Sequence, residues 1–222
     1  PTAAAPTAAA PTAALNGGGG GGFEHGAAPE GAGGESSKAA AERSMREQVV
    51  LRGHSGPVYG VGFSRDDNYV VSCSQDGTAR LWGVQQRACL VVYHAHASPV
   101  WSLSFAPIGH YFATCSYDRT VRVWRSDQTK PIRVLAGHLA DVRCCAFHPN
   151  VSYIASGSVD ASVRVWAVSS AKCVRLLCRH GHTAAVTCLA FSPDGHSLAS
   201  GGEVSDLDRT HQPWVLCDPH AH

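Results

Sequence analysis

The sequence predicts an all-β fold: a partial β-propeller with three complete four-stranded blades and part of a fourth. The first observation behind this prediction is that His54, His96 and His138 follow one another at intervals of 42 residues. The second is that an aspartate lies 22 residues after each of these histidines, and a tryptophan lies 6 residues after each aspartate. A repeat of about 40 to 45 residues that begins with Gly-His and has an aromatic residue near its end is typical of propeller blades.

Within the first repeat, four short apolar segments are separated by turn residues, as a small antiparallel sheet requires. The expected strands cover residues 58–64, 69–74, 78–84 and 88–93. The Asp76-Gly77 pair suits the tight turn before the third strand, because glycine adopts positive φ without a Cβ clash. The repeat spacing then places the blades at about residues 53–94, 95–136 and 137–178, with a partial fourth blade that ends near residue 203.

The segment before the repeats, residues 1–47, differs in composition from the rest of the chain. Residues 1–34 contain a stretch rich in Pro, Thr and Ala and a run of six glycines, with almost no large apolar side chains. We therefore expect this segment to be disordered. Residues 36–47 have a composition that suits a short helix leading into the propeller fragment at residues 48–203. Residues 49–51 occupy the position that an outermost strand has in the later repeats.

The repeat pattern breaks in the fourth unit. Gly181 and His182 open this unit, and residues 186–192 and 197–200 are its expected strands. The aspartate position, 22 residues after His182, is Val204, and the tryptophan position is Thr210. We therefore interpret residues 204–222 as a divergent tail without repeat landmarks or strand periodicity.

Charge and hydropathy exclude some classes of function. The net charge is +1, although residues 49–203 carry fourteen Lys or Arg against nine Asp or Glu, a balance of +5. Part of this excess is Arg80, Arg122 and Arg164, which recur four residues after each aspartate and are therefore interpreted as architectural. We expect no direct sequence-specific nucleic-acid binding. No run of about 18 apolar residues could cross a bilayer, so we expect a soluble, intracellular protein without membrane association.

The nine cysteines raise the question of disulfides or metal binding. Five of them fall in expected strands, where cysteine behaves as a small buried apolar residue: Cys73, Cys115, Cys144, Cys145 and Cys188. No Cys-x-x-Cys pair is present, so we expect reduced thiols and neither a structural zinc site nor a cofactor. Four ligand-type residues stand close together in the tail: His211, Cys217, His220 and His222. A physiological metal site in such a short polar segment is the weaker interpretation.

The landmark residues form three sets of four with the same spacing. The sets are His54, Ser72, Asp76 and Trp82; His96, Thr114, Asp118 and Trp124; and His138, Ser156, Asp160 and Trp166. A catalytic triad would occur once, whereas these sets occur three times. A buried indole N–H also needs a hydrogen-bond partner. We therefore predict a structural relay in each blade, from tryptophan through serine or threonine and histidine to aspartate, and we expect no enzyme activity.

The residues beside these landmarks vary, whereas the landmarks do not. Tyr59, Trp101 and Arg143 lie five residues after the histidines, and Gln75 and Tyr117 lie one residue before the aspartates. Aromatic and arginine side chains are the types that anchor protein interfaces, so these five positions are the candidate partner-binding residues. The alternative, given equal weight, is that Tyr59 and Trp101 pack into neighbouring loops.

Several runs of residues 49–203 resemble the WD-repeat family. This resemblance rests on Gly53-His54, on Leu81-Trp82 and on residues 118–124 and 160–166. Longer runs at residues 53–59, 99–101, 136–142 and 147–150 are similar to the C-terminal repeats of the TFIID subunit 5 family and its SAGA-type coactivator branch. The resemblance implies a partial WD-repeat β-propeller in the nucleus that contacts protein subunits of a TFIID or SAGA-type complex, histone-fold subunits included.

The function that this resemblance implies is a non-enzymatic interaction scaffold, a subunit or truncated isoform of such a complex, in RNA polymerase II transcription. The alternative is a generic WD-repeat adaptor, such as a ubiquitin-ligase substrate receptor or a signalling scaffold. An enzyme is the third class, which the repetition of every candidate catalytic set disfavours. Because an arc of three and a half blades leaves a bare apolar face at each end, we also expect the chain to self-associate, to be degraded or to be captured by a partner.

Overall fold

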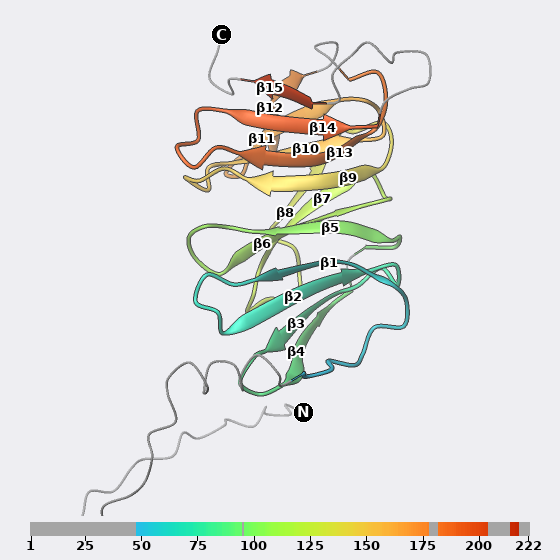
Figure 1. Cartoon of the computed structure of the whole chain (residues 1–222), viewed down its shortest axis with the longest axis vertical. Helices are drawn as coiled ribbons and strands as arrows, with labels where there is room; N and C mark the ends of the chain where they lie inside the picture. Colours follow the sequence, from blue (N-terminus) through green and yellow to red (C-terminus); the bar gives the residue numbers. More distant parts are fainter. Residues whose placement is uncertain (1–47, 95, 178–181, 204–213, 218–222) are drawn as a thin grey trace, which may run out of the picture. The chain divides into compact units, whose positions relative to one another are not determined.

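Short antiparallel strands make up the part of the chain that the structure describes. The computed structural model describes residues 48–94, 96–177 and 182–203, together with the backbone of residues 214–217. These residues contain fifteen strands and no helix, arranged in four sheets (Figure 1). The prediction of an all-β partial propeller is confirmed, while the expected helix at residues 36–47 lies outside the described residues.

Each of the first three sheets, here called blades 1 to 3, has four antiparallel strands in sequence order. Blade 1 consists of β1 (Val58–Phe63), β2 (Tyr69–Ser74), β3 (Ala79–Gly83) and β4 (Ala88–Tyr93). Blade 2 consists of β5 (Val100–Phe105), β6 (Tyr111–Ser116), β7 (Thr120–Arg125) and β8 (Arg133–Ala136). Blade 3 consists of β9 (Val142–Phe147), β10 (Tyr153–Ser158), β11 (Val163–Ala167) and β12 (Lys172–Leu177). The strands of blade 1 begin and end within one residue of the predicted bounds.

The fourth sheet, blade 4, has three strands: β13 (Val186–Phe191), β14 (Leu198–Gly202) and β15 (Trp214–Cys217). The expectation that no strand follows residue 203 is therefore wrong, because β15 pairs with β14 where the third strand lies in the other blades. Cys217 is the partner of Leu198, just as Trp82 is the partner of Val70 in blade 1. The free edge of β14 offers backbone hydrogen bonds that do not depend on side-chain identity, so a strand without the repeat landmark can still pair there.

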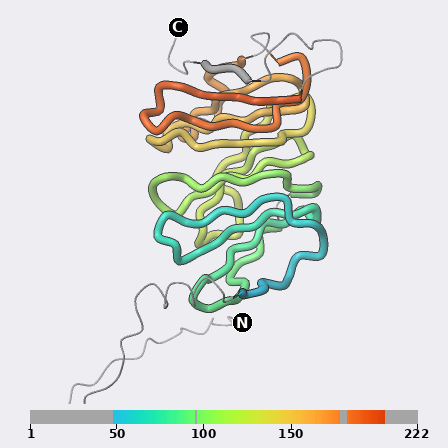
Figure 2. The backbone as a smooth tube through the Cα atoms, viewed as in Figure 1, coloured from blue at the N-terminus to red at the C-terminus, as the bar shows by residue number. Residues whose placement is uncertain are grey.

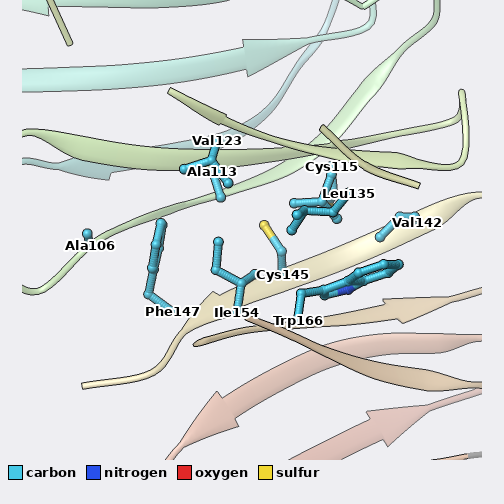
Figure 3. Close-up of a cluster of buried hydrophobic side chains, with 11 residues drawn as sticks. Ala106, Ala113, Cys115, Val123, Leu135, Val142, Cys145, Phe147, Ile154 and Trp166 are labelled. Atoms are coloured by element: carbon cyan, nitrogen blue, oxygen red, sulfur yellow. The ribbon is translucent and has the colours of Figure 1, made fainter. Parts of the chain in front are cut away.

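The blades stack in chain order through their first strands. β5 packs between β1 and β9, and β9 packs between β5 and β13 (Figure 2). Three clusters of buried apolar side chains fill the spaces between consecutive blades. In the cluster between blades 2 and 3, Cys145, Phe147 and Ile154 of blade 3 face Ala113 and Val123 of blade 2 (Figure 3). Each blade therefore depends on its neighbours for much of its core.

Residues at the two ends of the stack lack such a neighbour. Residues 49–51 form no strand, and Val50 is exposed. Cys188 is also exposed, which corrects the prediction that it is buried like the other four strand cysteines. The reason is that Cys188 lies on blade 4. The equivalent residue of blade 3, Cys144, faces blade 4, and Cys144 Sγ lies 3.7 Å from the carbonyl oxygen of Val186. No described blade covers Cys188 in this way.

Candidate functional site

The four landmark residues of each blade form one hydrogen-bonded chain, here called the relay. In blade 2, the indole Nε1–H of Trp124 donates to Thr114 Oγ1 over 2.8 Å, and His96 Nε2 lies 2.8 Å from the same oxygen. His96 Nδ1 lies 2.8 Å from Asp118 Oδ2. The same contacts, at 2.7 to 2.9 Å, recur in blades 1 and 3 through His54, Ser72, Asp76 and Trp82 and through His138, Ser156, Asp160 and Trp166.

The donors and acceptors in each relay follow from the groups at its two ends. An indole N–H can only donate, and an ionised carboxylate can only accept. In blade 2, the Nδ1–H of His96 therefore donates to Asp118, and His96 Nε2 accepts the hydroxyl proton of Thr114. Since Thr114 in turn accepts from Trp124, a neutral imidazole leaves every member of the relay with a partner.

A fifth residue, which the sequence reasoning missed, completes each relay. It is the serine or threonine two residues after the aspartate, and its hydroxyl donates to the second carboxylate oxygen. These contacts are Thr78 to Asp76 at 2.7 Å, Thr120 to Asp118 at 2.6 Å and Ser162 to Asp160 at 2.5 Å. The sequence does contain a pattern that points to this residue, because a serine or threonine occupies the position in all three complete repeats.

Hydrogen bonds keep the relay aspartates of blades 2 and 3 ionised, whereas burial keeps the histidines neutral. Burial by itself would raise the pKa of Asp118, but hydrogen bonds from His96 and Thr120 outweigh burial and lower that pKa to about 2. The pKa of Asp160 is lowered to about 2 by the same kinds of contact, again against the effect of burial. Burial lowers the pKa of His96 and His138 below the usual value of 6.5, although the neighbouring carboxylate acts in the opposite direction.

The free energy of unfolding is expected to fall in two steps as the pH is lowered. Below about pH 6.5 the unfolded chain binds protons at positions where folded His96 and His138 stay neutral, which favours the unfolded state. Below about pH 4 the same holds for Asp118 and Asp160, which stay ionised in the folded state to about pH 2. Thermal melts from about pH 8 to pH 3 measure this effect. A melting temperature that stays constant over this range would contradict the assigned protonation states.

The relay histidines of blades 2 and 3 are engaged within their own blades. His96 and His138 are buried, and their ring nitrogens are already paired within the blade. The geometry is that of a clamp, since it ties the loop before the first strand to the turn between the second and third strands. Among the described residues of blade 4, one contact of the relay is present: His182 Nε2 lies 2.7 Å from Ser200 Oγ. The aspartate position of this blade, Val204, lies outside the described residues.

A second cluster lies at the rim where the first strand of each blade begins. Tyr59, Trp101 and Arg143 occupy the second position of β1, β5 and β9, and together they form a stack across three blades, here called the rim stack. The ring centroids of Tyr59 and Trp101 are 4.9 Å apart. The guanidinium carbon of Arg143 lies over the Trp101 ring, 4.4 Å from its centroid. Arg143 also approaches Asp141, with an N–O distance of 3.8 Å.

Solvent reaches the rim stack and the residues beside it. Tyr59 and Arg143 are exposed, and Trp101 is half-buried between them. Gln75 and Tyr117 are also exposed, and their backbone N–H groups donate to the carbonyls of Pro57 and Pro99, which places them on the same rim beside the starts of β1 and β5. The structure thus joins three of the five candidate partner-binding residues into one surface and places the other two next to it.

The recurring arginines lie close to the relays of their own blades. Arg122 Nη2 donates to Asp118 Oδ2 over 3.2 Å. The guanidinium carbon of Arg164 lies 5.9 Å from the centroid of the Trp166 ring. These contacts support the architectural interpretation, since they engage the guanidinium groups within the blade.

The described residues hold neither a candidate metal cluster nor a candidate membrane-spanning helix. They contain no group of three or more His, Cys, Asp or Glu side chains placed to hold a metal ion. Of the ligand-type tail residues, His211, His220 and His222 lie outside the described residues, and the side chain of Cys217 is not described. The described residues also include no helix long and apolar enough to cross a membrane.

Comparison with protein families identifies the same repeats. The family model described as "WD domain, G-beta repeat" matches residues 45–83, 87–125, 129–167 and 171–210, more than half of the chain. The first three matches each end one residue after the tryptophan of the relay. The fourth match ends at Thr210, the residue at the tryptophan position of the incomplete repeat.

Individual relatives match shorter stretches of the chain. The subunit Taf5 of the SAGA and TFIID complexes of Schizosaccharomyces pombe is 56% identical over 45 residues, which are 20% of this chain and 7% of the relative. The TFIID subunit 5 of Drosophila melanogaster is 48% identical over 52 residues, 23% of this chain and 7% of the relative. The WD repeat and HMG-box DNA-binding protein 1 of Xenopus laevis is 44% identical over 46 residues, 21% of this chain and 4% of the relative. The matched stretches therefore span less than a tenth of the length of these curated relatives.

Proposed function

This chain belongs to the family of proteins with WD domain, G-beta repeats, and we propose that it is a non-enzymatic interaction scaffold in RNA polymerase II transcription. In this proposal it acts in the nucleus as part of a subunit of a TFIID or SAGA-type complex. The observation that carries the proposal is the identity of 56% over 45 residues and of 48% over 52 residues with two relatives named as subunits of these complexes.

The rim stack supports a binding role on geometric grounds. Tyr59 and Trp101 present flat side chains that are already held against each other, so little conformational freedom is lost when a partner covers them. Arg143 adds a guanidinium with five N–H donors. Its contact with Asp141 involves one of the guanidinium nitrogens, so other donors can reach a partner. We assign to this surface the contact with protein subunits of the complex, histone-fold subunits included.

A generic WD-repeat adaptor is the second candidate function. The comparison that favours it is the 44% identity with a protein named for WD repeats and an HMG box rather than for TFIID. Identity of this size can therefore reflect the repeat itself. Affinity purification of the tagged chain from nuclear extract, followed by mass spectrometry, separates the two candidates. TFIID or SAGA-type subunits support the first function, whereas ubiquitin-ligase components or signalling proteins support the second.

Arg143→Glu is expected to weaken association with the recovered complex by about 30-fold, the effect of losing about 2 kcal/mol at the centre of an interface. The physical reason is that the substitution removes the cation above Trp101 and places a second carboxylate near Asp141. The matched control is Arg133→Glu, the same change on the exposed part of β8. Quantitative pull-down of both variants measures the difference, and equal recovery of the complex would refute the role of the rim stack.

A further inference from the structure

A cavity of about 370 Å³ opens between blades 1 and 2, at the edge of the stack opposite the rim stack. The rim stack lies where β1 and β5 begin, whereas the cavity lies where these strands end, beside the loops that follow them (Figure 1). Its walls include six residues of the two blades: Ser64, Tyr69, Leu81, Phe105, Gly109 and Ser126. A cavity of about 210 Å³ lies at the equivalent place between blades 2 and 3. The repeat therefore forms this cavity twice, in two sizes.

Two side chains that line the smaller cavity are missing from the larger one. Val151 and Val168 line the smaller cavity and pack against the cluster between blades 2 and 3. The residues 42 positions earlier are Gly109 and Ser126. Val151 has a φ of 64°, in the left-handed region that a β-branched residue rarely adopts. Blade 3 thus narrows its cavity at some cost in backbone strain, whereas blade 2 leaves the equivalent space open.

The space between blades 3 and 4 shows what such a cavity can hold. The buried imidazole ring of His148 lies there, between the rings of Tyr153 and Phe191. The ring centroids are 5.9 Å and 5.0 Å from that of His148, and both contacts are edge-on. His148 Nε2 lies 3.0 Å from the carbonyl oxygen of Gly195. A planar ring with a polar nitrogen therefore fits between the tyrosine of one blade and the phenylalanine of the next.

The larger cavity repeats this arrangement without the ring in the middle. Three of the four positions keep their residue type, namely Tyr69 for Tyr153, Phe105 for Phe191 and Gly109 for Gly195, while Ser64 replaces His148. Gly109 and Gly195 also have nearly the same φ, 80° and 77°. A Cβ at Gly195 would lie 2.5 Å from His148 Nε2. Among the described residues, and apart from its chain neighbours, a Cβ at Gly109 would come within 4 Å of Tyr111 alone. The place of the imidazole is thus open beside Gly109.

Hydrogen bonds between blades 1 and 2 hold the walls of the larger cavity in place. Arg65 Nη1 donates to the carbonyl oxygen of Pro107 over 2.8 Å, and the Tyr93 hydroxyl donates to that of Ser126 over 2.8 Å. Filling a cavity with fixed walls costs little conformational freedom. An apolar cavity of about 150 Å³ is large enough for benzene, so this cavity has room for a bicyclic ring.

We propose that the cavity between blades 1 and 2 binds a tryptophan side chain of a partner protein. The indole lies between Tyr69 and Phe105, and its N–H donates to the Gly109 carbonyl oxygen. An indole matches the site because its single polar group can only donate, whereas an imidazole brings a second nitrogen that needs a donor. The exposed Arg65 and Asp66, which also line the cavity, carry opposite charges, so the site favours neither an anion nor a cation.

Nuclear magnetic resonance of the 15N-labelled 222-residue chain tests this proposal with N-acetyltryptophanamide as the probe. We expect saturable shifts of the amide signals of residues 64–66 and 109–110. N-acetylalaninamide, which lacks the ring, is expected to cause no such shifts. The N1-methylated tryptophan probe is expected to bind about fivefold more weakly, the effect of losing one hydrogen bond. Equal binding of the methylated probe would show that the Gly109 carbonyl is not read.

A second test fills the cavity from within. Ser64→His combined with Asp66→Asn copies the His148–Asn150 pair of blade 3 into blade 1 and is expected to abolish probe binding. The matched control is Ser192→His with Asp194→Asn, the same change in blade 4, where the serine likewise donates to the aspartate two residues later. This control is expected to bind the probe like the unsubstituted chain.

Ser126→Val, which copies Val168, provides a variant that leaves the turn after β1 unchanged. It narrows the cavity and is expected to weaken probe binding, so the proposal stays testable if the double variant fails to fold. The absence of saturable shifts in the unsubstituted chain would overturn the proposal. Binding that survives Ser126→Val and the folded Ser64→His, Asp66→Asn variant unchanged would also overturn it.

Discussion

Trp124→Ala is expected to lower the free energy of unfolding by about 3–5 kcal/mol, the usual cost of emptying a buried aromatic site. Trp124 is 0% exposed, and its ring centroid lies 5.3 Å from that of Tyr93 in blade 1 and 6.1 Å from that of Phe112 in its own blade. The substitution therefore removes packing from both sides of the interface between blades 1 and 2. It also leaves the Thr114 hydroxyl without the indole N–H that donates to it. Urea unfolding followed by circular dichroism measures the loss.

Trp101→Ala is the matched control for this prediction. The same atoms are removed, but Trp101 is only half-buried and stacks between Tyr59 and Arg143 at the rim. The expected loss is about 1–2 kcal/mol, from one aromatic pair and one cation–π contact. Equal losses for the two variants would mean that burial between blades does not distinguish these tryptophans, and the assignment of Trp124 to the core would be wrong.

The strands and relays were predictable because both rest on local rules that recur with a fixed period. Apolar segments between turn residues gave the bounds of β1 to β4 within one residue. The spacing of 18 residues from His96 to Thr114 and of 10 from Thr114 to Trp124 brings these side chains together, because β6 pairs with β7 and the loop before β5 returns to the same end of the blade. Because the relay residues and the four-stranded sheet repeat with the same period, the same four positions meet in each of blades 1 to 3.

Features that depend on contacts between blades were harder to predict. The rim stack arises because the second positions of β1, β5 and β9 lie side by side when the blades pack, and no pattern within one repeat encodes this order. The exposure of Cys188 depends on whether a further blade covers blade 4, which the strand sequence itself does not determine. Strand β15 was missed because pairing with β14 needs an open edge and an extended backbone, not the tryptophan that marks the other third strands.

His138→Ala is expected to lower the free energy of unfolding by about 1–3 kcal/mol, the cost of leaving a buried polar group without its partner. His138 is buried, with Nδ1 2.9 Å from Asp160 Oδ2 and Nε2 2.8 Å from Ser156 Oγ. Alanine would remove one donor from the Asp160 carboxylate and the acceptor of the Ser156 hydroxyl. The loop before β9 would lose its tie to the turn between β10 and β11, and thermal melting should report the loss.

The fourth repeat supplies the matched control for this change. His182 Nε2 makes the same contact with its serine, at 2.7 Å from Ser200 Oγ, but the aspartate position of this repeat is Val204. His182→Ala therefore removes a histidine from a repeat that has valine at the aspartate position, and its loss of stability should be smaller than that of His138→Ala. If His138→Ala melts like the unsubstituted chain but loses association with the transcription complex, the histidine acts in recognition. A loss of stability that exceeds the loss in His182→Ala shows instead that the carboxylate-terminated relay is a structural clamp within its blade.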